Sequence, residues 1–114
     1  MNTQTRLSSD GVIGFFELDD DGVIRYCRPA ASTDGAVDSA IGEDFFEHTR
    51  LQNRDELMRR FHQFLSSRDG ADSFPFDCMF ENGVVHTRIT FTRAFKTDSF
   101  PPEGMVMISI REGQ

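Results

Sequence analysis

An alternation of apolar and polar side chains runs through residues 72–95, on both sides of an Asn-Gly pair. The apolar positions are Phe74, Phe76, Cys78 and Phe80 before the pair, and Val85, Thr87, Ile89, Phe91 and Phe95 after it. Side chains two residues apart lie on the same face of a strand, so this spacing predicts two strands that share one aromatic face. Asn82-Gly83 is a strong hairpin signal because both central residues of that turn take positive φ. We therefore predict a long antiparallel hairpin turning at Asn82 and Gly83.

A hairpin alone is marginally stable in water, so its aromatic face needs further strands and a cover of helices. Three more segments rich in Val, Ile, Phe or Met predict strands: residues 11–18, 23–28 and 104–111. The Asp-rich turn between the first two contains Gly22, which we expect to take positive φ. Hairpin neighbours are antiparallel, and the last strand has to pair beside the first to close one sheet. The predicted fold class is α+β, with a five-stranded antiparallel sheet and helices on one face.

The helices of the predicted cover come between the two hairpins. Residues 43–48 favour a short helix with two adjacent Phe side chains, and Asn53 is a suitable N-cap for a longer helix that runs to about Ser67. Within it an apolar stripe repeats at helical spacing, formed by Leu57, Phe61, Phe64 and Leu65. We expect Gly70 to end this helix in the left-handed conformation. Residues 30–40 favour short helical turns, and residues 96–103 a loop.

Size and charge limit the possible functions. The chain has 114 residues, enough for one domain over residues 11–112 after a linker or arm at 1–10. Its net charge of −7 disfavours nucleic acid or an anionic membrane as a partner. No apolar run approaches the roughly 18 residues of a membrane span. We expect Cys27 and Cys78 to be reduced core thiols in a cytoplasmic protein.

The order of these segments resembles a PAS domain over residues 11–112, nearly the whole chain. The resemblance lies in LDDDG at 18–22, IGEDFF at 41–46, the main helix and the long hairpin. The IGEDFF stretch and the later RDELMRRF are similar to the photoactive-yellow-protein branch of that family. The resemblance implies a sensory module that binds a small ligand between sheet and helices. It also implies a homodimer and an attached output domain, such as a histidine kinase or a transcription regulator.

The photoactive branch carries a coumaroyl chromophore on a Cys just after its short helix. Residues 47–56 contain no Cys, and Leu51 or Gln52 falls nearest that position. Tyr26 matches the branch's chromophore-binding Tyr, but its Glu partner falls on Ala30. The resemblance thus extends to the scaffold of the branch, and we expect no coumaroyl chromophore.

Candidate ligand-binding residues follow from the aromatic face and the resemblance. We expect an apolar pocket lined by Phe46, Phe61, Phe76, Cys78 and Phe91, with Tyr26 as a polar group; alternatively, Tyr26 is an ordinary strand residue. His62 flanks the helical stripe and resembles the axial His of haem-binding PAS domains, but no second motif supports haem, so we do not expect it. His48 and His86 are expected at the surface.

Two hypotheses remain open from the sequence. In the first, the chain senses a small apolar or aromatic ligand. In the second, the Phe side chains fill the core, and the outer face of the sheet docks a partner through Met79, Thr90, Thr92, Met105 and Met107. Neither a nucleophile–base pair nor a phosphate loop is evident, so we do not expect an enzyme. The acidic turn after Glu17 resembles half of a calcium loop, but the twelfth position is Arg28, where a carboxylate is needed, so no metal site is expected.

Overall fold

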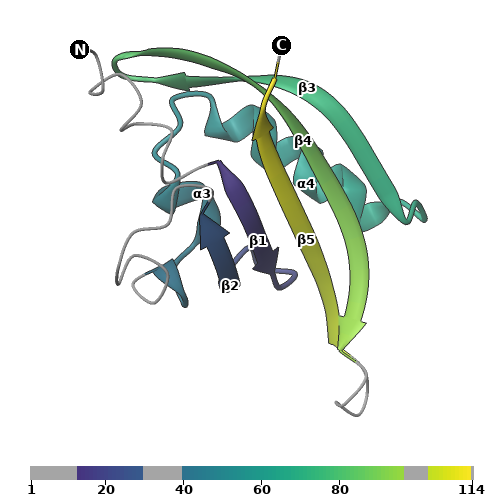
Figure 1. Cartoon of the computed structure of the whole chain (residues 1–114). Coiled ribbons are helices and arrows are strands. Elements are labelled where there is room, and N and C mark those ends of the chain that lie inside the picture. The colour runs from purple at the N-terminus through teal and green to yellow at the C-terminus, as the bar shows by residue number, and fades with distance from the viewer. Residues whose placement is uncertain (1–12, 30–39, 97–102, 114) are drawn as a thin grey trace.

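The computed structural model describes residues 13–29, 40–96 and 103–113, and every structural statement below concerns these residues. Two short strands come first, then two helices, then three longer strands (Figure 1). Their bounds are β1 Gly14–Leu18, β2 Ile24–Pro29, α3 Phe45–His48, α4 Arg54–Ser66, β3 Ala71–Phe80, β4 Gly83–Lys96 and β5 Glu103–Glu112. The predicted linker at 1–10, the turns over most of 30–40 and the loop after Lys96 lie outside the described residues.

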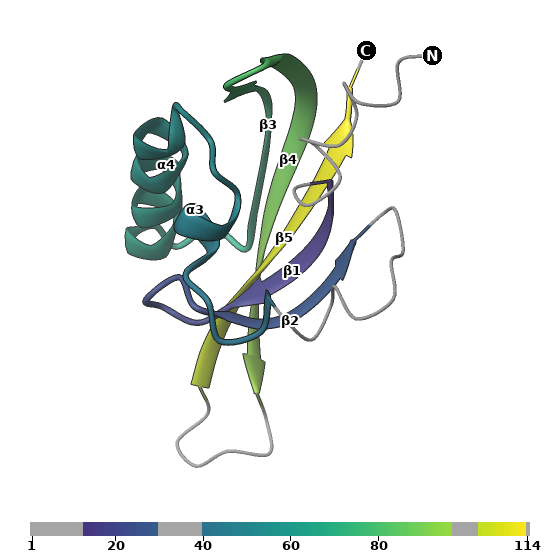
Figure 2. The ribbon, with the colours of Figure 1, turned by 90° about the vertical axis from the view of Figure 1, so that its left-hand side faces the viewer.

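All five strands form one antiparallel sheet in the order β2-β1-β5-β4-β3. The last strand lies between the first strand and the long hairpin, as predicted. Both helices cover the same face of the sheet, so the molecule has two layers (Figure 2). The α+β prediction is therefore confirmed, and a helix layer stands over the aromatic face.

The long hairpin turns one residue earlier than predicted. Phe80 pairs with Gly83, so the two turn residues are Glu81 and Asn82, and Gly83 opens β4 with φ 150°. The pairing along the strands moves by two residues as a result, and Cys78 lies opposite Val85. A shift of two leaves every side chain on its predicted face, because the side-chain period of a strand is also two.

The first hairpin turns at Gly22, which has the predicted positive φ, 84°. A Cβ atom at this glycine would lie 3.2 Å from the Phe46 ring, so the turn also needs a residue without a side chain. Asp19 stabilises the same turn, since its carboxylate accepts hydrogen bonds from the backbone N–H groups of Asp21 and Val23, both at 3.0 Å. These contacts bring the first hairpin against α3.

The caps of the two helices differ, and those of α4 depart from the sequence prediction. Asp44 caps α3 by accepting hydrogen bonds from the N–H groups of Phe46 (2.9 Å) and Glu47 (3.2 Å). Asn53 holds the N-cap position of α4, but its side chain makes no capping hydrogen bond, contrary to our expectation. Gly70 is not among the residues with positive φ, so it does not end α4 in the left-handed conformation. The extended C-cap residue Ser67 ends that helix instead.

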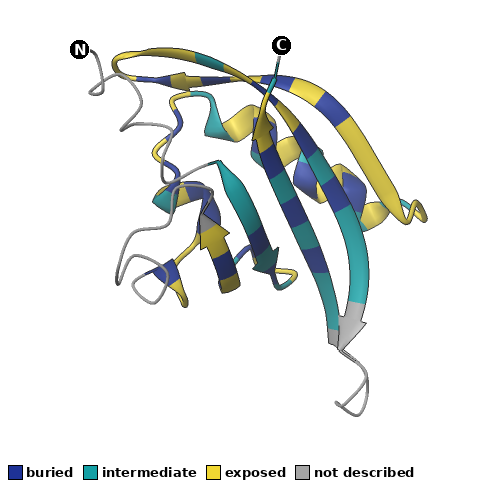
Figure 3. Cartoon of the chain, in the orientation of Figure 1, coloured by how far each residue is buried: buried dark blue, intermediate teal, exposed yellow. Residues whose placement is uncertain are grey.

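The core lies between the helix layer and the inner face of the sheet (Figure 3). Strand β3 contributes one of its two faces to this core, because its residues alternate between exposed and buried from Ser73 to Phe80. The buried Phe side chains are Phe16, Phe45, Phe46, Phe61, Phe64, Phe74, Phe76, Phe80 and Phe91. The aromatic face of the long hairpin therefore points at α4, as predicted.

Candidate functional site

The predicted pocket residues are packed against one another in the core. Phe46, Phe61, Phe76, Cys78 and Phe91 are all buried, and Phe61, Cys78 and Phe91 are fully enclosed. Phe61 comes from α4 and Phe91 from β4, so the contact between their rings joins the helix layer to the sheet. The sequence thus predicted which side chains meet at this interface.

Ring contacts continue across the whole interface. The centroids of Phe46 and Phe61 are 5.4 Å apart, those of Phe61 and Phe91 6.0 Å, and those of Phe74 and Phe91 5.4 Å. Phe45 extends the series to Phe46 at 5.1 Å. These rings meet edge to face, at spacings typical of well-packed aromatic pairs. These rings form the interface between α4 and the sheet, where the sequence predicted a ligand pocket.

Cys78 and Thr87 form a small polar pair within this core. The hydroxyl of Thr87 donates a hydrogen bond to the carbonyl of Phe76 at 2.7 Å, and the sulfur of Cys78 lies 3.6 Å from the same hydroxyl. Burial raises the pKa of the Cys78 thiol and outweighs the effect of its hydrogen bond with Thr87, so the thiolate is disfavoured. Cys78 is therefore a packing residue with an unreactive thiol.

Tyr26 lies on the opposite face of the sheet from the aromatic cluster, contrary to our expectation. Tyr26 pairs with the outer-face residue Glu17, whereas its neighbour Cys27 pairs with Phe16 and is buried. A bulge at Arg25, between the pairs Glu17–Tyr26 and Leu18–Ile24, then returns Ile24 to the inner face. The alternation is interrupted there, and Ile24 and Cys27 point inward while Tyr26 is 37% exposed. Its ring instead meets that of Phe15 on the outer face, at 6.3 Å.

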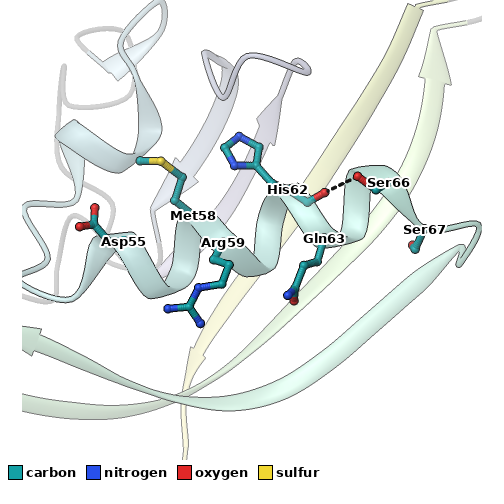
Figure 4. A pocket seen from close by; sticks show the side chains of 7 residues that line it. All are labelled: Asp55, Met58, Arg59, His62, Gln63, Ser66 and Ser67. Carbon is teal, nitrogen blue, oxygen red and sulfur yellow. Dashed lines mark hydrogen bonds between the residues drawn. The ribbon is translucent and has the colours of Figure 1, made fainter.

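His62 lies on the outer surface of α4 and is exposed. It lines a shallow, open hollow along the helix with Asp55, Met58, Arg59, Gln63, Ser66 and Ser67 (Figure 4). The ring is exposed on one side and lies beside the core on the other, with its centroid 5.8 Å from that of Phe61, and the other residues around it are mostly polar. Its backbone carbonyl accepts a hydrogen bond from the Ser66 hydroxyl at 3.1 Å. The structure thus separates Tyr26 from the pocket residues with which the sequence grouped it, and places His62 at the edge of that group, beside Phe61.

A second hollow lies where the first turn of α4 meets the edge of β3. It is lined by Asn53, Glu56, Pro75, Phe76, Asp77 and Met79. Phe76 belongs both to the core and to this hollow, so the aromatic cluster comes close to the surface here. The Asn53 side chain bridges the hollow: its Nδ2 donates to the Asp77 carbonyl at 2.8 Å, and its Oδ1 accepts from the Met79 N–H at 3.2 Å.

One part of each edge of the sheet is occupied by the chain itself. On β3 the Asn53 bridge is joined by the Gln52 N–H, which donates to the Met79 carbonyl at 2.7 Å, and Pro75 has no N–H to offer. On β2 the Ile24 N–H donates to Glu43, and the Ile24 carbonyl accepts from Gly42. Occupied edges and an edge proline disfavour pairing with a strand of another molecule.

The outer face of the sheet, opposite the helices, carries no covering element among the described residues (Figure 2). Its centre is partly buried and mixes apolar and small polar side chains: Phe15, Glu17, Thr90, Thr92, Met105, Met107 and Ser109. Thr90, Thr92, Met105 and Met107 lie on this face as predicted, and Met79 is exposed on the same side, opposite Val84. Phe15 also lies on this face, a position that the alternation of β1 could have predicted.

Arg93 is a structural residue that the sequence analysis did not single out. It points from β4 to the end of α4, where its guanidinium donates to the carbonyls of Phe64 (2.7 Å), Ser67 (3.1 Å) and Asp69 (3.2 Å). The same group lies 4.8 Å from the centre of the Phe64 ring. With Asn53 at the other end, it fastens α4 to the sheet at both termini.

The described residues contain no group of three or more His, Cys, Asp or Glu side chains placed to hold a metal ion. The acidic turn is instead internally bonded, since Asp19 also accepts from the Arg25 guanidinium at 2.6 Å. None of the helices that the structure describes could span a membrane.

Comparisons with known proteins identify the fold. No family model matches the sequence, and no curated protein matches it. Among solved structures, the chain is similar to the PAS domain of an HTR-like protein from Haloarcula marismortui, with a TM-score of 0.60, 15% identity and coverage of 97% of this chain and 92% of that one. It is also similar to the PAS domain of BvgS from Bordetella pertussis, with a TM-score of 0.58, 16% identity and coverage of 97% and 85%. It is similar as well to a PAS domain from Desulfitobacterium hafniense, with a TM-score of 0.58, 10% identity and coverage of 96% of this chain and 99% of that one. The chain has the PAS fold, as its resemblance implied.

Proposed function

We propose that this chain is a PAS-type signalling module that works as a homodimer through the outer face of its sheet, with its core filled by its own side chains. The observation that carries the proposal is the unbroken series of Phe ring contacts between α4 and the sheet. A resident ligand would have to separate rings that are already at contact distance. Signalling through protein contacts needs no such separation.

The surface of the sheet supports the second half of the proposal. Phe15 and Met107 are only partly buried although both lie on interior strands of the sheet. Apolar side chains surrounded by polar ones are typical of a surface that docks a protein. Part of each edge is occupied by the chain itself, whereas no described element covers this face. A second copy of the chain presents the same mixed surface and can bury it in a symmetric interface.

The output of such a module lies outside this domain. Two of the similar structures are each described as the PAS domain of a named protein. By analogy we place this chain beside an output domain, such as a histidine kinase or a transcription regulator. The dimer would pass a change in the packing of one subunit to its partner and to that domain.

A single substitution on the outer face tests the dimer. Met107→Lys places a charge at the centre of the proposed interface, and Gln63→Lys adds the same charge to the outer surface of α4. Sedimentation velocity should show dimers for the wild type and Gln63→Lys and monomers for Met107→Lys, with unchanged circular dichroism. A wild type that stays monomeric, or a folded Met107→Lys variant that stays dimeric, would overturn the proposal.

Ligand sensing is the second candidate, and the hollow beside Asn53 and Phe76 favours it. There the aromatic cluster approaches the surface, and a small apolar or aromatic molecule could enter by displacing the Phe76 ring. Phe76→Trp would fill that entrance. Organic extraction of freshly purified protein, followed by mass spectrometry, tests this candidate: a stoichiometric small molecule that Phe76→Trp loses, while the dimer persists, would support it.

A further inference from the structure

The hollow where the first turn of α4 meets the edge of β3, which we call the edge hollow, combines apolar surface with acidic groups. Its volume is about 420 Å³, which lies in the range of about 300–1,000 Å³ that is typical of ligand sites. Pro75, Phe76 and Met79 supply the apolar part, and Glu56 and Asp77 supply two carboxylates. No Lys, Arg or His is among the described residues that line it. The side chains of the edge hollow therefore carry a negative charge with no positive charge among them.

Glu56 has no ion-pair partner within the part of the chain that the structure describes. Arg59 and Arg60 follow it by three and four residues, the helical spacings at which an acid and a base can pair. Arg59 instead lines the hollow along α4 (Figure 4), and Arg60 lies over the Phe74 ring, 4.2 Å from its centre. The exposed Glu56 carboxylate is thus available to a cation from outside.

Asp77 is engaged through only one of its two carboxylate oxygens. Its Oδ1 lies 2.6 Å from Nδ1 of His86, and the second oxygen has no partner among the described residues. The backbone groups beside it are occupied, because the Asn53 side chain bonds to the Asp77 carbonyl and to the Met79 N–H. An occupant of the edge hollow therefore binds through a side chain and not as an added strand.

We infer that the edge hollow binds an arginine side chain of a partner protein. The apolar stem of the arginine covers Pro75 and Met79, and its planar guanidinium bonds to the carboxylates of Glu56 and Asp77. Arginine is among the residue types most enriched at the energetic centres of protein interfaces. The net charge of −7 also attracts a basic segment from a distance. Phe76 stays in the core, so this occupant differs from a small apolar ligand that displaces its ring.

An NMR titration of the ¹⁵N-labelled chain with acetyl-arginine-amide tests the site. The probe should shift the amide signals of Asn53, Asp77 and Met79 and reach saturation, with a Kd on the order of 1 mM for a molecule of this size. Acetyl-citrulline-amide, which has the same shape without the charge, should bind at least about threefold more weakly. A blocked Gly-Ser-Arg-Ser-Gly peptide should bind at least as tightly as the arginine probe, because the edge hollow lies at the surface.

Two matched pairs of variants separate the site from general effects of charge and polarity. Glu56→Gln should raise the Kd of the arginine probe about threefold or more. Asp55→Asn makes the same charge change in the same turn of α4 but lines the other hollow, so it should leave the Kd unchanged. Met79→Ser should also weaken binding, whereas Val84→Ser, at the exposed cross-strand neighbour, should not.

Several results refute the inference, and none of them depends on the oligomeric state of the chain. Equal binding of the arginine and citrulline probes, or shifts that grow without saturation, would show that the edge hollow does not recognise a guanidinium. Equal effects of Glu56→Gln and Asp55→Asn would show that only the overall charge matters. Binding of the arginine probe but not of the peptide would assign the edge hollow to a free cationic molecule and exclude a protein segment.

Discussion

Arg93→Met should loosen α4 from the sheet. The substitution keeps an unbranched apolar side chain beside Phe64 and removes the guanidinium. Three carbonyls at the end of α4 then lose their hydrogen bonds from this group, those of Phe64, Ser67 and Asp69. The helix end also loses a positive charge, which interacts favourably with its dipole.

The expected cost can be estimated from these contacts. A hydrogen bond from a charged group contributes about 1.5–3 kcal/mol when fully buried, and less where water can replace it. The Arg93 side chain is partly exposed, and the Phe64 and Ser67 carbonyls are part-buried. The cation–π contact adds about 0.5 kcal/mol at such a site. We therefore expect Arg93→Met to lower the free energy of unfolding by about 2–3 kcal/mol.

Urea unfolding monitored by far-ultraviolet circular dichroism measures this cost. Arg93→Lys should lose about half as much as Arg93→Met, because it keeps the charge but not the planar fork that reaches several carbonyls. Arg59→Met, on the exposed side of α4, is the matched control and should change the free energy by less than about 0.5 kcal/mol. A loss below about 0.5 kcal/mol for Arg93→Met would refute the view that this arginine fastens the helix.

Further predictions concern the backbone, pH and the thiols. Arg50 has φ 58°, a left-handed conformation that costs a non-glycine residue about 1 kcal/mol. Arg50→Gly should therefore raise the melting temperature measured by calorimetry, and a lower one would contradict this strain. Burial tends to raise the pKa of Asp19, but the hydrogen bonds from Val23, Arg25 and Asp21 outweigh it and hold the pKa below 3.8. The contribution of the Asp19 carboxylate to the free energy of unfolding is therefore complete above pH 3.8 and is lost as the pH falls through the lower pKa of the folded state. Asp19→Asn should flatten the plot of urea midpoint against pH in that acid range. An unchanged plot would contradict this. Both thiols are buried, so Ellman's reagent should react with them only as fast as the protein unfolds, and rapid labelling of the native protein would argue against the packing described.

The fold was predictable because its strongest signals are local and repetitive. The alternation around Cys78 predicted the correct face for each side chain although the predicted turn position was wrong, because a register shift of two residues leaves each side chain on its face. The stripe of α4 likewise predicted Leu57, Phe61 and Phe64 as core residues, and all three are buried. Periodicity therefore identified both layers and the surface between them.

The parts that the sequence did not predict depend on contacts between distant segments. Asn53 is a good N-cap by residue type, but a strand 24 residues later takes up its side chain. Arg93 donates hydrogen bonds to the end of a helix that lies 26 to 29 residues earlier in the sequence. Tyr26 was expected in the pocket because it matches the chromophore-binding Tyr of the resembling branch, but its neighbour Cys27 faces the core, so Tyr26 faces outward. The candidate site was thus predicted in its apolar part and not in its polar part.

Native mass spectrometry of the freshly purified chain measures the number of subunits and any retained molecule in one spectrum. The filled core and the outer-face dimer together predict the mass of two chains with nothing added. The mass of a single chain at all concentrations, or a dimer that carries a stoichiometric small molecule released only on unfolding, would contradict them.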